Sequence, residues 1–204
     1  MKKVNTRNLV QTALLGAIAY VLMLLRFPLP FMPPFMDFDF AAIAEMIGAF
    51  IMGPVAGVTI VGIKVLLKTV TTGTGSAFTG EIQNFILHSV FVLTAALIYR
   101  RSMTHKAAIL GMIVGTLVSA SVAVFTNMYM IIPFFAKIYG YDMSAIVESV
   151  NKVNRYVDSE LKFVLFGIIP FNVIKWGTTT AVLSIAYTKL PRLMRISSRE
   201  VSMS

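Results

Sequence analysis

The chain lacks the residues from which disulfides and most metal sites are built. Its 204 residues include no cysteine and only two histidines, His88 and His105. Disulfides and thiolate chemistry are therefore excluded, and two isolated histidines do not make a histidine-based metal site. We expect no metal and no bound cofactor.

Charged residues are also scarce. They make up 13% of the chain, against about a quarter of a soluble protein, whereas 57% of the residues are hydrophobic and the mean hydropathy is +0.79. This balance excludes an ordinary soluble domain. Because apolar runs of about 20 residues can cross a bilayer, we predict an all-α integral membrane protein with one domain over residues 1–204.

The apolar runs and the breakers between them predict six transmembrane helices, at 9–26, 40–53, 54–72, 82–100, 107–132 and 163–188. The second is the weakest, because a helix of about 13 residues at ~1.5 Å each reaches only ~20 Å of a ~30 Å core. Gly53 and Pro54 predict a tight turn after it, since proline suits the first turn of a helix. The first run is longer than a signal peptide needs, so we expect it to be retained.

The net charge of +9 would suit a nucleic-acid-binding protein, but the basic residues lie at the ends of the apolar runs. If the N-terminus is cytoplasmic, ten of the 18 fall on the inner side: Lys2, Lys3, Arg7, Arg100, Arg101, Lys106, Lys189, Arg192, Arg195 and Arg199. Cytoplasmic loops are enriched in Lys and Arg, so both termini are predicted to be cytoplasmic. We expect the lipid bilayer, and no nucleic acid, as a partner.

Polar side chains at membrane depth are costly, which makes each one a candidate site residue. In the sixth predicted helix, Asn172 and Lys175 share a face at i,i+3, and Pro170 frees a backbone carbonyl one turn earlier. These residues indicate either a ligand site or a kink stabilised by an internal ion pair of Lys175 with Glu45 or Asp39.

Further polar residues lie toward the predicted outer side. Asn127, near the end of the fifth helix, suits either a ligand contact or helix packing. A possible pocket rim is formed by Asp39, Lys64, Lys68, Glu81 and Asn84. The alternative for this set is an ion-pair network that holds the loops, and we expect Glu45 to pair with Lys64 or Lys68.

No motif supports an enzyme. Gly75 and Gly80 have the spacing of a phosphate-binding loop, but Glu81 stands where that motif needs lysine. No nucleophile elbow, HExxH motif or deep carboxylate pair is present. We expect a chain with no ATPase site of its own.

Four segments resemble a known family. Arg26–Phe35, Asp39–Phe40 and Gly53–Gly57 resemble the first loop and hairpin of the riboflavin-binding S components of energy-coupling factor (ECF) transporters, and Ile168–Lys175 resembles their sixth helix. The resemblance implies a six-helix binding subunit in the bacterial cell membrane. Such a subunit captures the vitamin from outside and docks on a transmembrane coupling subunit that carries two ATPase subunits.

The resemblance also implies roles for single residues. The ligand contacts of the family fall on Phe38, Asn127, Asn172 and Lys175. Ala13 and Ala17 form a small-xxx-small pattern, which alone indicates close helix packing of either kind, internal or between subunits. In the family such a pattern faces the coupling subunit, so we expect a partner interface there.

Some alternatives stay open. Asp37 is charged where the resemblance leads us to expect a neutral residue, which puts the contacts of the first loop in doubt. The same architecture could serve folate, thiamine or pantothenate. A stand-alone secondary transporter that uses Lys175 and Glu45 for proton coupling and a purely structural protein are the other candidates.

Overall fold

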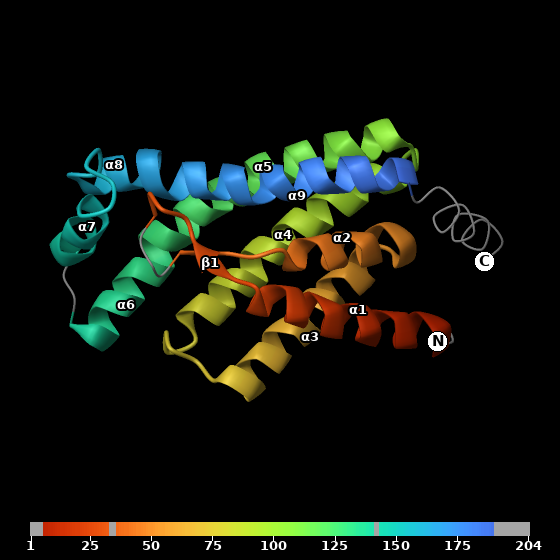
Figure 1. Ribbon diagram of the computed structural model, residues 1–204, viewed down its shortest axis with the longest axis horizontal. Helices are drawn as coiled ribbons and strands as arrows, with labels where there is room; N and C mark the ends of the chain where they lie inside the picture. Colours follow the sequence, from red (N-terminus) through yellow and green to blue (C-terminus); the bar gives the residue numbers. More distant parts are fainter. Residues whose placement is uncertain (1–5, 33–35, 141–142, 190–204) are drawn as a thin grey trace.

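The computed structural model describes residues 6–32, 36–140 and 143–189 (Figure 1). The longest helices are α1 (Thr6–Leu24), α3 (Pro54–Thr72), α4 (Thr79–Arg100), α5 (His105–Thr126) and α9 (Ile169–Lys189). Shorter helices are α2 (Ala41–Met52), α6 (Ile132–Tyr139), α7 (Met143–Asn151) and α8 (Glu160–Phe163), with π-helical turns η1 (Asn127–Ile131) and η2 (Val164–Ile168). Two short strands, β1 (Phe27–Pro28) and β2 (Asp37–Phe38), pair antiparallel.

Five helices of the described chain are long and apolar enough to cross a membrane: Thr6–Leu24, Pro54–Thr72, Thr79–Arg100, His105–Phe134 and Glu160–Tyr187. They correspond to five of the six predicted spans, and the last begins three residues before the predicted 163. The second predicted span is α2, which has only 12 residues. It is an apolar helix too short for a full crossing, as its length in the sequence suggested.

The predicted turn between α2 and α3 is present. Gly53 has φ +106° and Pro54 occupies the start of α3. Glycine reaches this φ without the steric penalty that a side chain would bring. A Cβ at position 53 would also lie 3.1 Å from the guanidinium carbon of Arg100, so the turn and the end of α4 lie together.

Both π-helical turns precede a proline by two residues, Pro133 after η1 and Pro170 after η2. Proline has no N–H and its ring clashes with the carbonyl four residues earlier, so the helix must adjust there. Four residues before Pro170 is Phe166, and its carbonyl oxygen accepts a hydrogen bond from Asn154 Nδ2 at 3.2 Å. The freed carbonyl is thus used by the segment that follows α7.

Figure 1 shows that α1 begins and α9 ends at one end of the molecule, while helices α6, α7 and α8 lie at the other end. The main hydrophobic core is formed by residues of α2, α4, α5 and α9, among them Met46, Phe91, Met112 and Trp176. These helices hold the candidate site described below.

Small residues let α5 pack closely on α4. A Cβ added to Gly111 would lie 2.6 Å from the carbonyl oxygen of Ala95, and one added to Gly115 would lie 3.0 Å from that of Phe91. One turn further along, Ser119 Oγ donates a hydrogen bond to the carbonyl of Leu87 at 3.0 Å. Small residues at such positions are a common basis of helix association in membranes.

We expect Gly111→Ala to destabilise the protein by about 1–3 kcal/mol, because its methyl group would force two backbones apart. Gly177→Ala in α9 is the matched control, since a Cβ there meets nothing within 4 Å and alanine favours helix by up to about 1 kcal/mol. Melting temperatures in detergent should fall for the first variant only. Equal melting temperatures would contradict the close-packing argument.

Candidate functional site

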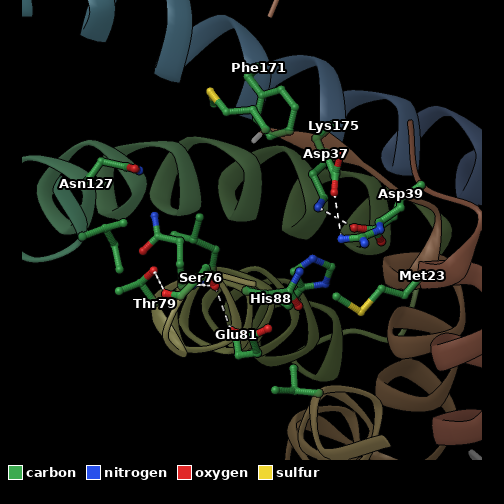
Figure 2. Close-up of a pocket in the computed structure, with 18 of the residues that line it drawn as sticks. Met23, Asp37, Asp39, Ser76, Thr79, Glu81, His88, Asn127, Phe171 and Lys175 are labelled. Carbon is green, nitrogen blue, oxygen red and sulfur yellow. Dashed lines mark hydrogen bonds and ion pairs between the residues drawn. The ribbon is translucent and has the colours of Figure 1, made fainter. Parts of the chain in front are cut away.

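A cavity of about 640 Å³ lies among the helices (Figure 2). Its wall is built by the loop after α1, the C-terminal part of α3, the N-terminal part of α4, the loop between these two helices, η1, and α9. Of the residues predicted for a site, Asn127, Asn172, Lys175, Asp39, Lys68, Glu81 and Asn84 line it. Segments far apart in the sequence are thereby brought together around one space.

Lys175 is ion-paired with Asp39 at the wall of the cavity. Lys175 Nζ lies 2.8 Å from Asp39 Oδ2, and the side chains are 7% and 3% exposed. Asp39 Oδ1 accepts a hydrogen bond from the backbone N–H of Ala41 at the start of α2, at 2.9 Å. Burial alone would raise the pKa of Asp39, but the positive charge of Lys175, together with that of Lys64, outweighs it and holds the pKa below its ordinary value. Lys175 therefore both forms the internal ion pair and lines the cavity.

The two amides predicted from the sequence both face the cavity from helices. Asn172 Nδ2 donates to the carbonyl of Ile168 at 2.9 Å, and Asn127 Nδ2 donates to that of Ala123 at 2.7 Å. These bonds to the preceding turn fix the orientation of each side chain. Each NH2 group has a second hydrogen and each amide oxygen is an acceptor, so both amides can still hydrogen-bond to a ligand.

Lys68 and Glu81 form an ion pair that anchors the loop between α3 and α4. Lys68 Nζ also donates to the carbonyl of Gly73 at 3.0 Å, while Glu81 Oε2 accepts from Thr74 Oγ1 and Ser76 Oγ, each at 3.0 Å. Several residues of this loop line the cavity. Lys68 and Glu81 therefore hold the loop between α3 and α4 and also line the cavity.

Lys64, predicted as a possible rim residue, instead lies fully buried away from the cavity wall. Its Nζ is 2.6 Å from Glu45 Oε1, and both side chains are 0% exposed. Glu45 Oε2 is 2.6 Å from His88 Nδ1. The expected pairing of Glu45 with one of the two lysines is confirmed. The i,i+4 spacing predicts that Lys64 and Lys68 share a face of α3. It does not predict how deeply each side chain is buried, and Lys64 lies one turn further into the helix bundle.

Phe38 lies behind the cavity wall. It is 4% exposed in β2, and its ring centroid is 5.4 Å from that of Phe27 and 5.3 Å from that of Phe40. It packs in a cluster with Phe171, which does line the cavity. The side chain predicted to touch a ligand therefore supports a residue that lines the cavity.

The unexpected charge of Asp37 has a structural partner. Arg26 Nη1 donates to Asp37 Oδ2 at 3.0 Å across the β1–β2 pairing. Both residues line the cavity. The three cation-bearing positions of the wall, Arg26, Lys68 and Lys175, are each paired with a carboxylate, so these pairs add no net charge to it.

Among the residues of the wall that were not singled out from the sequence are Gln83, His88, Phe171 and Trp176. His88 carried a usable signal, because an ionisable residue inside an apolar run is a candidate site residue by default. Trp176 and Phe171 read as ordinary core residues, and Trp176 indeed stacks on Phe91 with ring centroids 4.5 Å apart. Only the folded arrangement places their edges on a cavity.

Ala13 and Ala17 are exposed on α1. The close internal contact of this helix is made instead by Gly16, where an added Cβ would lie 2.5 Å from Ile63. Packing within the chain therefore does not account for the two alanines. They belong to an apolar outer face with Leu14 and Ile18.

Comparison with known proteins identifies the family. The family model of the ECF transporter substrate-specific component matches residues 7–187. The chain belongs to this family. Its members are transporter components, which agrees with the prediction that the chain is not an enzyme.

This S component has curated relatives of similar length. It is 29% identical over 191 residues to the riboflavin transporter RibU of Staphylococcus aureus (strain TCH60), covering 94% of each chain. It is 29% identical over 187 residues to the riboflavin transporter FmnP of Bacillus subtilis (strain 168), covering 91% of this chain and 93% of that one. A solved S component of a bacterial ECF transporter matches with a TM-score of 0.72 at 30% identity, over 91% of this chain and 95% of that chain.

The buried charges of this S component lead to a stability prediction. Glu45→Gln leaves Lys64 without its counter-charge, and breaking a buried ion pair costs about 3–5 kcal/mol. We expect a marked fall of the melting temperature in detergent, partly recovered in the double variant Glu45→Gln/Lys64→Met.

Glu148→Gln is the control, since Glu148 and its partner Lys152 are 73% and 71% exposed and such pairs contribute little. A fall for Glu45→Gln no larger than that for Glu148→Gln would contradict the prediction.

Proposed function

We propose that this chain is the riboflavin-binding S component of an ECF importer in the bacterial plasma membrane. The observation that carries the proposal is the cavity into which Asn127, Asn172 and Lys175 converge from η1 and α9. Its volume of about 640 Å³ lies within the ordinary range for small-molecule sites. The curated relatives that resemble the chain over its length are riboflavin transporters.

The charge of the wall favours riboflavin over the other vitamins considered. Arg26, Lys68 and Lys175 are each matched by a carboxylate. An uncharged ligand leaves these pairs intact, whereas the carboxylates of folate and pantothenate or the cation of thiamine would have to disrupt one or add an unpaired charge. Riboflavin is uncharged and carries a flat ring with a polar edge, which suits an apolar cavity with a few hydrogen-bonding groups.

Each site residue has a proposed part. Asn127 and Asn172 supply both donor and acceptor to the polar ring edge, and Lys175 donates from a position fixed by Asp39. Phe171, supported by Phe38, covers the ring. The loop anchored by Lys68 and Glu81 forms the rim over which the ligand enters.

The proposed topology has six membrane crossings with both termini in the cytoplasm. The N-terminal end of α1 and the C-terminal end of α9 lie at the same end of the molecule (Figure 1). Because α2 alone is too short, it would make up the second crossing together with the loop before it. The cavity then opens to the outside, where a capture subunit needs it.

A proton-coupled stand-alone transporter is less well supported. That alternative needs Lys175 and Glu45 to act together, but Lys175 is paired with Asp39 and Glu45 with Lys64 and His88. We propose instead that uptake is driven by a transmembrane coupling subunit and two ATPase subunits, with Ala13 and Ala17 at the contact.

The first test is the colour of the protein. Purified in detergent from cells supplied with riboflavin, the chain should carry a flavin absorbance spectrum. Asn172→Leu removes one hydrogen-bonding partner from a buried site, which should lower riboflavin affinity roughly tenfold to a hundredfold. Quenching of flavin fluorescence measures the affinity.

Asn8→Leu is the control, because Asn8 is an exposed amide on α1. Unchanged binding in Asn172→Leu would refute the assigned site, and a wild-type chain that neither copurifies with flavin nor quenches its fluorescence would refute riboflavin as the ligand.

The partner interface is tested separately. Ala13→Leu and Ala17→Leu enlarge an exposed face without touching the cavity, so riboflavin affinity should stay within about twofold of wild type. ATP-dependent uptake by the assembled transporter should fall at least about tenfold, because small residues are what allow two helices to approach closely. Ser121→Leu, on the exposed side of α5, should leave both unchanged. Normal uptake in the alanine variants would place the interface elsewhere.

A further inference from the structure

Unpaired polar atoms gather on one wall of the cavity. In the described part of the chain, four cavity-lining residues bury side-chain atoms that hydrogen-bond to no protein group: both amide atoms of Gln83, Asn84 Oδ1, His88 Nε2 and Trp176 Nε1. Gln83, Asn84 and His88 lie on consecutive turns of α4. Figure 2 shows His88 on the side of the cavity opposite Phe171. A buried polar group without a partner costs about 1–3 kcal/mol, so this concentration calls for a ligand that satisfies it.

The chemistry of these atoms is mixed. His88 Nδ1 is 2.6 Å from Glu45 Oε2 and 3.1 Å from Lys64 Nζ, so we assign the hydrogen to Nδ1 as a donor to the carboxylate. In a neutral imidazole Nε2 is then an acceptor. The indole N–H of Trp176 can only donate, and the two amides of α4 offer both donor and acceptor groups.

The wall is also held rigidly. His88 and Trp176 are each 1% exposed. Their rings meet edge to face with centroids 4.8 Å apart, and Trp176 stacks on Phe91. The ion pair of Glu45 with Lys64 fixes the far side of the imidazole. Such preorganised polar groups lose little freedom when a ligand binds.

We propose that Gln83, Asn84, His88 and Trp176 form a hydroxyl-binding wall that holds the polyol chain of the ligand. A hydroxyl group both donates and accepts, so a row of hydroxyls can satisfy a wall that offers both donors and acceptors. The ring edge of a flavin is mostly acceptor and suits the amides and the lysine contributed by η1 and α9. The inference rests on the proposed function, because it takes riboflavin as the ligand.

The test compares riboflavin with lumiflavin, which has the same ring system and a methyl group in place of the polyol. Wild-type protein should bind riboflavin more tightly. Gln83→Met and Asn84→Leu keep the size of the side chain and remove its polar atoms. Each should weaken riboflavin binding about tenfold, the effect of one lost hydrogen bond in a buried site, and leave the affinity for lumiflavin unchanged.

Ser89→Ala is the matched control. Ser89 Oγ is also buried without a partner in the described chain and follows His88 directly, but it does not line the cavity. We expect Ser89→Ala to leave both affinities unchanged. Lumiflavin binding reports that each variant is folded, and the melting temperature of the empty protein should not fall in Gln83→Met or Asn84→Leu, since each removes an unpaired group.

The outcomes separate the two claims. Wild-type protein that binds neither flavin refutes the proposed function. Riboflavin binding that is unchanged in both variants, equal losses for the two ligands, or equal wild-type affinity for riboflavin and lumiflavin would each overturn the hydroxyl-binding wall while leaving the riboflavin assignment in place.

Discussion

The cost of placing charge in a membrane interior organises this structure. A charged side chain at that depth needs a partner or a water-filled space, and the deepest ones here have partners: Lys64 with Glu45 and His88, and Lys175 with Asp39. These contacts link α2, α3 and α4 in one case and the start of α2 with α9 in the other. These ion pairs therefore join the helices that form the wall of the cavity.

The same constraint separates structural polar groups from binding groups. Charges are neutralised within the protein, as at Lys175 and Asp39. Uncharged polar atoms of the cavity-lining Gln83, Asn84, His88 and Trp176, in contrast, have no hydrogen-bond partner within the described part of the chain. An unpaired charge would cost far more than an unpaired amide or imidazole nitrogen. A site for an uncharged, hydroxyl-rich molecule can therefore leave its neutral groups free while its charges stay matched.

Much of the fold could be predicted because apolar runs and breakers report directly on helices in a bilayer. The five long spans, the short α2 and the Gly53–Pro54 turn follow from length and local backbone chemistry. The convergence of Asn172 and Lys175 on one face followed from helical spacing. What spacing could not supply was depth and partner: it did not distinguish buried Lys64 from Lys68 at the rim, or Asp39 from Glu45 as the partner of Lys175.

The remaining differences have the same origin. The family resemblance implies that Phe38 is a ligand contact, but the β1–β2 pairing places it against Phe27 and Phe40. The π-helical turns depend on how helices adjust to Pro133 and Pro170, which the sequence marks only as interruptions. His88 was visible as an ionisable residue in an apolar run, yet its role depends on which nitrogen Glu45 engages.

The proposed ligand site and the proposed docking surface lie on different parts of this chain. The cavity draws its polar groups from α4, η1 and α9, whereas the exposed Ala13 and Ala17 lie on the outer face of α1. Between them, α1 packs on α3 through Gly16 and Ile63, and α3 carries Lys64, which is held by Glu45 of α2. A partner bound to α1 therefore contacts a helix that is joined to the cavity wall by close packing and a buried ion pair rather than by a mobile loop. Such a connection favours movement of the subunit as one body, because tightly packed interiors transmit displacement with little deformation.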